Sequence, residues 1–256
     1  MNNIVYLPIE IKSRDFQNKL LLSYFLLQDG FEVFLGRKKE IEILNTLCQK
    51  HSDSHKNFSI IDMGAGTGRV VFALDKKLRN NSIEFFGVEN SDSMLNYANQ
   101  KNISHNGLSE ITFLKYDLTD SKLSQYFVLK NSNIVMCSYN TMGVVPSDKR
   151  LSFINNMKTI AGKNGLVILT MFNGDDFGFV APKLYHSMLP MIKQIDDDSF
   201  DETNRVFHNS IGFRSQWFTK NEIKSMLDTS LEPISIDVTI DDKCFTFGNV
   251  FVNVIT

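Results

Sequence analysis

The chain has 256 residues, 43% of them apolar, and a formal net charge of -2. This length suits one α/β domain with a sizeable core, and the near-neutral charge argues against nucleic acid as a partner. The three scattered cysteines indicate neither a disulfide framework nor a zinc site, so we expect no metal. Because no apolar run could span a membrane and the N-terminus lacks a signal-peptide pattern, we expect a cytoplasmic protein without membrane association.

The first 57 residues are predicted to form an N-terminal extension or cap. Residues 4–9 are rich in strand formers, and residues 16–27 carry apolar side chains at helical spacing. Residues 38–49 predict an amphipathic helix with one apolar face. Residues 51–57 predict a polar linker whose two histidines lie in solvent.

From residue 58 to the C-terminus, short apolar runs alternate with helical stretches, which is typical of a parallel sheet covered on both faces. The expected strands are residues 59–63, 84–89, 111–116, 133–138 and 165–172. The expected helices are residues 69–78, 91–102, 123–127 and 148–161. The pattern predicts a Rossmann-like, doubly wound, mostly parallel sheet in a domain over residues 58–256.

Residues 173–218 break this rhythm and predict an insertion resembling a lid, with local helix. After it, Thr219 and Glu222 have the spacing of a capping box that opens a helix. Residues 233–240 and 244–255 then predict an antiparallel hairpin, which brings the expected sheet to seven strands.

A glycine-rich turn follows the first strand of this domain. Gly64, Gly66 and Gly68 let the backbone turn tightly and let a ligand approach closely. Glu89 ends the next strand, 21 residues after Gly68, near the interval expected for a carboxylate that binds ribose hydroxyls. Arg69 stands where a dinucleotide motif needs a small residue, so the spacing disfavours NAD.

The segment Asp62-Met63-Gly64-Ala65-Gly66-Thr67-Gly68 resembles the D-x-G-x-G-x-G signature of class I S-adenosylmethionine-dependent methyltransferases. Three later stretches, residues 87–95, 113–118 and 134–140, are similar to further motifs of that family in the same order. The resemblance covers residues 58–172 well. It implies S-adenosylmethionine as cofactor and methyl transfer as the reaction.

The resemblance also implies roles on the methionine and ribose side of the cofactor. Asp62 would approach the methionine amino group, and Glu89 would hold the ribose hydroxyls. Ser138 and Tyr139 would lie near the sulfonium. The backbone would approach the cofactor at Gly64, Ala65, Gly66 and Gly68.

On the adenine side, the resemblance places Asn90 and Met94 beside the ring. Asp117 would accept from adenine N6, and Leu118 would donate its backbone N–H. Asp117 also precedes Thr119 in a way that is typical of a turn, so a structural role is the alternative.

Displacement of a methyl group from a sulfonium proceeds in line and needs no metal, so positioning contributes most and no catalytic residue is identified. Asn140 either contacts the acceptor or braces a turn. Aromatic residues of the insertion either cover the substrate or form the insertion's own core. The candidate substrate residues are Tyr24, Asn140, Tyr185, Arg214 and Trp217.

A small-molecule acceptor, methylated at nitrogen or oxygen, is the favoured substrate class. The alternatives are a methyltransferase acting on nucleic acid or protein, or a catalytically inactive regulator that binds S-adenosylmethionine. Residues 6–36 are also similar to the opening of bacterial surface-carbohydrate biosynthesis proteins.

Overall fold

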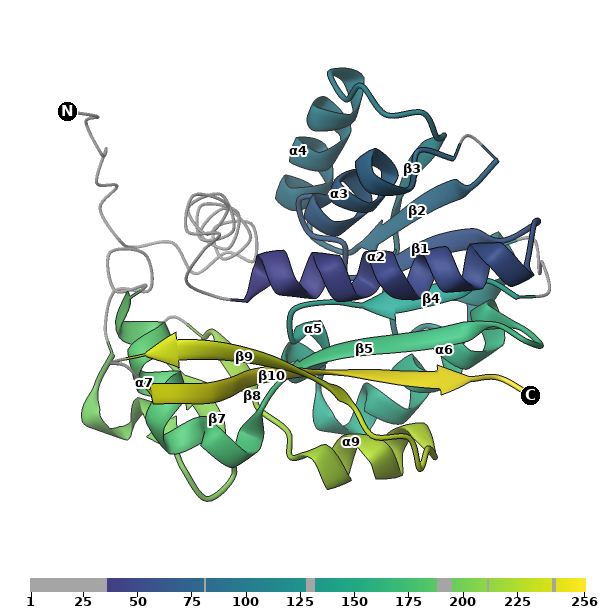
Figure 1. The fold of residues 1–256 in the computed structure, drawn as a ribbon. Coiled ribbons are helices and arrows are strands. Elements are labelled where there is room, and N and C mark those ends of the chain that lie inside the picture. Colours follow the sequence, from purple (N-terminus) through teal and green to yellow (C-terminus); the bar gives the residue numbers. More distant parts are fainter. Residues whose placement is uncertain (1–35, 81, 128–131, 188–194, 211, 241–242) are drawn as a thin grey trace.

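The central sheet organises the chain in the computed structural model, which describes residues 36–256 except residues 81, 128–131, 188–194, 211 and 241–242. Its seven strands have the order β3-β2-β1-β4-β5-β10-β9 (Figure 1). The parallel strands are β1 (Ser59–Met63), β2 (Glu84–Glu89), β3 (Ile111–Lys115), β4 (Ile134–Cys137) and β5 (Leu166–Phe172). A hairpin of β9 (Ile234–Ile240) and β10 (Lys243–Val254) completes it, with β10 antiparallel to β5. The predicted fold class is confirmed.

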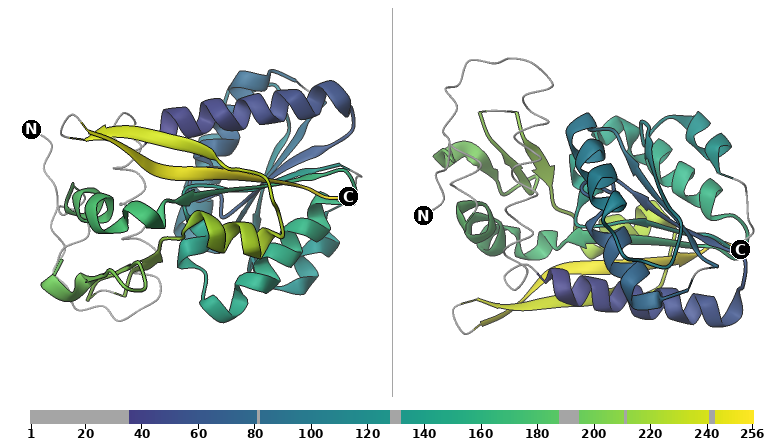
Figure 2. Two further views of the ribbon diagram at one scale, coloured as in Figure 1. Left: turned by 60° about the horizontal axis from the view of Figure 1, so that its bottom comes forward. Right: turned by 90° about the horizontal axis from the view of Figure 1, so that it is seen from above.

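Helices cover both faces of this sheet, with α2 on one face and α6 and α9 on the other (Figure 2, left). The alternation of side chains along β1 explains the two layers, since Ile60 joins one buried cluster and Ile61 the other. The helices are α2 (Arg37–Ser54), α3 (Arg69–Leu78), α4 (Asp92–Ile103), α6 (Arg150–Ala161) and α9 (Lys220–Leu227). Shorter turns are η1 (Ser121–Tyr126), α5 (Thr141–Val144) and η2 (Ser147–Lys149).

The insertion between β5 and α9 contains a second, antiparallel sheet. Its strands are β6 (Phe200–Asp201), β7 (Val206–His208) and β8 (Arg214–Gln216), and they follow η3 (Gly174–Asp176), α7 (Phe177–Ser187) and η4 (Asp197–Ser199). The prediction of local helix alone was therefore incomplete. Strands of two or three residues are too short to display a period of two in the sequence.

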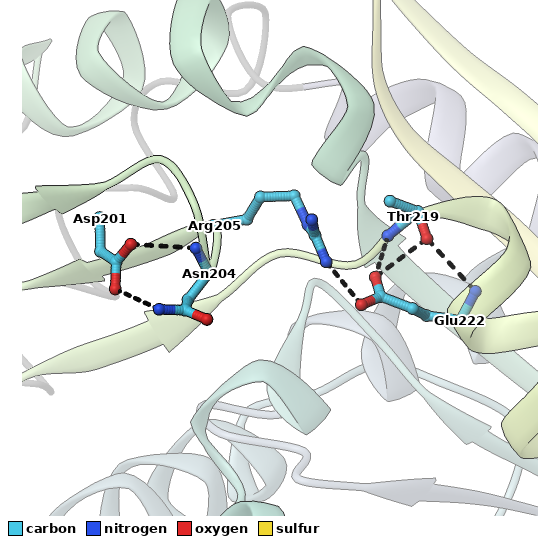
Figure 3. Close-up of polar contacts among 5 residues, drawn as sticks. All are labelled: Asp201, Asn204, Arg205, Thr219 and Glu222. Atoms are coloured by element: carbon cyan, nitrogen blue, oxygen red, sulfur yellow. Dashed lines mark hydrogen bonds and ion pairs between the residues drawn. The ribbon is translucent and has the colours of Figure 1, made fainter.

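Polar contacts tie this second sheet to helix α9 (Figure 3). The predicted capping box is present, because Glu222 N donates to Thr219 Oγ1 and Thr219 N donates to Glu222 Oε2. Arg205 donates from Nη2 to the other carboxylate oxygen of Glu222. Asn204 donates to Asp201 and closes the turn between β6 and β7. One carboxylate thus begins α9 and anchors the insertion.

Helix α2 corrects the prediction of a polar linker after residue 50, because it continues to Ser54. His51 is only 6% exposed, and its Nε2 lies 2.6 Å from Ser132 O, so the expectation of a solvated histidine was wrong. The reason is spacing: Ile41, Leu44, Cys48 and His51 share one helix face. Burial lowers the pKa of His51, and the proximity of His55 adds to this shift.

The apolar face of α2 belongs to the same buried cluster as the sheet, while the proposed domain boundary at residue 57 stays a prediction. Tyr24, the strand and helix expected before residue 28, and residues 6–35 of the second resemblance lie outside the described residues. Within the described part of the chain, no helix has both the length and the apolar character needed to cross a membrane.

Candidate functional site

The candidate cofactor residues gather at one edge of the sheet, where the adjacent parallel strands β3, β2, β1 and β4 end. Ligands of open α/β sheets bind outside these carboxyl ends. The turn after β1 folds onto the end of β2, because Gly64 N and Ala65 N both donate to Val88 O at 2.8 and 3.0 Å. Gly66 N donates to Glu89 Oε2 at 2.9 Å. The glycine turn and its acidic partner are therefore in direct contact.

The three glycines of this turn all have positive φ angles, but the space around them differs. A Cβ at Gly64 would lie 2.3 Å from Thr141 Cγ2, and one at Gly68 would lie 2.6 Å from Phe72 Cε2. At Gly66 the nearest described heavy atom would be Met94 Sδ, at 3.7 Å. Gly64 and Gly68 are thus required by packing, whereas Gly66 leaves space free beside Glu89.

The Glu89 carboxylate holds the turn in place. Its Oε1 accepts from Asn90 N and Ser91 N, each at 2.8 Å, in addition to the Gly66 bond on Oε2. Burial raises the pKa of Glu89, and these backbone donors oppose that rise. A carboxylate has about four acceptor positions, so three backbone bonds leave capacity for another donor. The ribose role implied for Glu89 stays a prediction.

Asp62 is the most perturbed carboxyl group of this edge. It is 1% exposed, and its Oδ1 is buried without a hydrogen-bond partner among the described residues, as is Ser138 Oγ. Burial raises the pKa of Asp62 to about 7, with Arg69 opposing the rise and Glu40 adding to it. The Ser138 hydroxyl also opposes it, although the two side chains fall short of hydrogen-bond geometry. A buried acid of this kind suits a cationic group as partner.

We expect Asp62→Asn to stabilise the ligand-free protein as pH rises. The raised pKa means that the folded state favours protonated Asp62, so its contribution is fully present below the unfolded pKa of about 4 and is lost as pH rises through about 7. Urea denaturation of both proteins between pH 5 and 8 measures this. The unfolding free energy of Asp62→Asn minus that of the wild-type protein should increase from pH 5 to about pH 7 and stay constant above it. A difference independent of pH would mean that Asp62 is ionised throughout.

A charged network around Tyr139 was missed by the sequence analysis. Tyr139 N donates to Glu40 Oε1 at 3.0 Å, and Arg69 Nη2 donates to Glu40 Oε2 at 3.0 Å. The guanidinium groups of Arg37 and Arg69 lie 4.5 and 5.5 Å from the centre of the Tyr139 ring. Burial raises the pKa of Tyr139 to about 12, and both arginines oppose this rise. Glu40 and Tyr139 are 99 residues apart, so no local motif announces the contact.

On the adenine side, Asp117 follows β3 and is exposed. Its Oδ1 accepts from Thr119 N at 2.9 Å and from Thr119 Oγ1 at 2.8 Å, so it opens a turn as the alternative interpretation expects. Met94 is buried beside Gly66, Asn90 is exposed, and Leu118 is partly buried. The adenine contacts implied for these residues stay predictions.

The described substrate candidates do not share one surface. Tyr185 and Trp217 are buried, and Trp217 Nε1 donates to the Tyr185 hydroxyl at 3.1 Å. Tyr185 also stacks on Phe207 with ring centroids 3.8 Å apart. Arg214 is exposed on β8. The contacts favour the packing interpretation for the two aromatic residues over direct contact with a substrate.

Asn140 is buried and its side-chain amide is fully engaged. Its Oδ1 accepts from Phe172 N, and its Nδ2 donates to Ser215 Oγ and Gln216 O. The structure therefore supports the bracing interpretation of Asn140. Among the described residues, no group of three or more histidine, cysteine, aspartate or glutamate side chains is arranged to hold a metal ion.

Comparison with known proteins finds a family model, described as a methyltransferase domain, that matches residues 54–231. A curated relative, carboxy-S-adenosyl-L-methionine synthase of Campylobacter hominis, is 30% identical over 110 residues. That match spans 43% of this chain and 42% of the relative.

Solved structures with the same fold include an S-adenosylmethionine-dependent methyltransferase from Clostridium acetobutylicum. It is 15% identical with a TM-score of 0.58, over 93% of this chain and 98% of that one. A second is Burkholderia thailandensis 1,6-didemethyltoxoflavin-N1-methyltransferase, with bound 1,6-didemethyltoxoflavin and S-adenosylhomocysteine. It is 12% identical with a TM-score of 0.56, over 98% of this chain and 93% of that one.

Proposed function

This chain belongs to the methyltransferase domain family, and from that premise we propose that it binds S-adenosylmethionine and transfers the methyl group to nitrogen or oxygen of a small-molecule acceptor. The observation that carries the proposal is the edge of the sheet where Gly66, Glu89 and Asp62 meet. There a glycine leaves space beside one carboxylate, and one oxygen of a second, buried carboxyl group, Asp62 Oδ1, has no hydrogen-bond partner among the described residues. A ligand with both hydroxyl groups and a cationic end matches these residues.

S-adenosylmethionine, when bound, supplies a methyl group on a positively charged sulfonium. The residues at this edge would then bind and orient rather than react. Asp62 would hold the ammonium end, and Glu89 would hold the ribose hydroxyls. Ser138 and Tyr139 would lie near the sulfonium. Orienting the reactants in this way accounts for about 7–11 kcal/mol of barrier lowering in favourable cases.

A small molecule is the acceptor class that the comparisons support. The Burkholderia thailandensis enzyme holds a small heterocyclic ligand, and its structure aligns over nearly the whole of this chain. The curated relative is named for synthesis of a carboxylated form of the cofactor, which is also a small molecule. The near-neutral net charge adds no general attraction for nucleic acid.

Calorimetry with S-adenosylmethionine, followed by incubation with fractionated small-molecule, RNA and protein extracts, tests the proposal. Mass spectrometry should detect S-adenosylhomocysteine and a methylated product with the small-molecule fraction. Turnover with only RNA or protein would overturn the acceptor class. Binding without turnover in any fraction would identify a regulator, and a carboxylated cofactor would identify the reaction of the curated relative. Absence of binding would refute the proposal as a whole.

Glu89→Ala should weaken S-adenosylmethionine binding by about 1–3 kcal/mol, because the ribose donors lose their acceptor and the Gly66 turn loses its anchor. The matched control is Glu84→Ala, which removes a carboxylate from the opposite end of the same strand. Calorimetry should show a normal dissociation constant for the control. Unchanged affinity in folded Glu89→Ala protein would remove Glu89 from the binding site.

A further inference from the structure

Asn140 joins three parts of the molecule through one side chain. It lies directly after the Ser138–Tyr139 turn, its Oδ1 accepts from Phe172 N at 3.2 Å, and its Nδ2 donates to Ser215 Oγ at 3.0 Å. A further bond from Nδ2 reaches Gln216 O at 3.0 Å. The end of β4, the end of β5 and strand β8 of the insertion therefore meet at one amide, which is 2% exposed.

The strand that Asn140 contacts leads directly into the core of the insertion, because Gln216, whose carbonyl accepts from Asn140 Nδ2, is the chain neighbour of Trp217. Burial raises the pKa of Tyr185 to about 12, and the bond from Trp217 opposes the rise. Trp217 Nε1 donates to Tyr185 at 3.1 Å. We call Asn140, Ser215, Tyr185 and Trp217 the buried relay. All four are buried, and interruption of such a network is costly because its groups have no water to replace a lost partner.

The turn held by this relay has an unusual backbone. Tyr139 and Asn140 are consecutive residues with φ of 51° and 62°, a left-handed conformation that costs non-glycine residues energy. Backbone bonds from Tyr139 N to Glu40 Oε1 and from Asn140 N to Thr170 O hold it. The Asn140 side chain fills the remaining space, since a Cβ at Gly143 would lie 2.4 Å from Asn140 Nδ2. Because Tyr139 and Asn140 are adjacent in this turn, a shift of Asn140 would move the backbone that carries Tyr139.

We propose that Asn140 is a positioning residue for methyl transfer, which fixes Tyr139 at the reaction edge and couples that edge to Trp217 through the buried relay. This inference rests on the proposed function for its kinetic consequence. Its structural consequence does not, because the relay consists of contacts between this chain's own residues.

Asn140→Asp is the direct test, because it keeps the size and the acceptor for Phe172 N but replaces the donor to Ser215 and Gln216. S-adenosylhomocysteine affinity should change by less than about threefold, while single-turnover methyl transfer should fall about 10- to 100-fold. Trp217 is the single tryptophan of the chain, so its fluorescence reports on the far end of the relay. The change in emission on adding S-adenosylhomocysteine should be largely lost in the variant.

Phe172→Leu is the control, since it interrupts the ring contacts from Tyr139 through Phe172 to Trp217 but leaves the relay intact. It should keep the fluorescence response. Ser215→Ala removes the acceptor of the Asn140 Nδ2 bond and should reproduce the loss if Asn140→Asp folds poorly. A full response in both relay variants would overturn the coupling, and a wild-type single-turnover rate in Asn140→Asp would overturn the positioning role.

Hydrogen exchange of the ligand-free protein separates this inference from the proposed function. Asn140 N and Gly143 N are both hydrogen-bonded in the turn, and Asn140→Asp should speed their exchange while Phe172→Leu should not. If neither the wild-type protein nor a variant binds S-adenosylhomocysteine but this difference is seen, the proposed function fails and the relay stands. Unchanged exchange in Asn140→Asp would overturn the relay whether or not the wild-type protein is a methyltransferase.

Discussion

Gly66→Val should abolish S-adenosylmethionine binding, with an affinity loss of about 100-fold or more, equivalent to about 2.7 kcal/mol. Gly66 has φ of 55°, where a β-branched residue is strained, and its added atoms would enter the space beside Glu89. The ligand-free protein should lose some stability from this strain, about 1–3 kcal/mol. Calorimetry and thermal denaturation measure the two effects separately.

Gly212→Val is the matched control, because Gly212 also has a positive φ, of 90°, but lies in the turn before β8 of the insertion. It should lose stability and keep cofactor affinity. Gly66→Ala should fall between wild type and Gly66→Val, since its Cβ would lie at an ordinary contact distance of 3.7 Å from Met94 Sδ. Normal binding by folded Gly66→Val protein would show that the glycine turn is structural only.

The parallel half of the fold was predictable because buried strands and helices alternate regularly along the sequence. The bounds expected for β1, β2 and α3, residues 59–63, 84–89 and 69–78, agree with the structure. Strand β1 is buried throughout and ends at a glycine turn, so an apolar run followed by glycine marks its limits. The capping box at Thr219 was predictable for a similar reason, since both partners lie within four residues.

The rest depends on contacts between distant residues. Glu40 reaches Tyr139 from helix α2, and the sequence of α2 shows only an amphipathic helix. Ser215 bonds to Asn140 across 75 positions, and nothing in the three-residue strand β8 distinguishes it from a loop. The glycine turn and its partner Glu89 could therefore be predicted from the sequence. The contact of Glu40 with Tyr139 could be found only in the structure.

Trp217 illustrates how the structure bears on two open interpretations. Its sequence position in an aromatic-rich insertion allowed either a substrate contact or a place in the insertion's own core. In the structure it is 0% exposed and its ring packs near Phe172 and Phe177, with centroids 4.8 and 5.6 Å away. It belongs to the buried cluster that continues into the main sheet, so the described insertion is part of the core.

Trp217→Ala should accordingly destabilise the whole protein by about 3–5 kcal/mol, the cost of emptying a large aromatic site and leaving Tyr185 without its donor. Trp217→Phe should cost less because it keeps most of the packing. Arg214→Ala, an exposed change three residues earlier on the same segment, should stay within about 0.5 kcal/mol. Urea denaturation followed by circular dichroism measures all three, since fluorescence is lost with the tryptophan. Wild-type stability in Trp217→Ala, with impaired turnover alone, would contradict the packing role and favour the interpretation of Trp217 as a substrate contact.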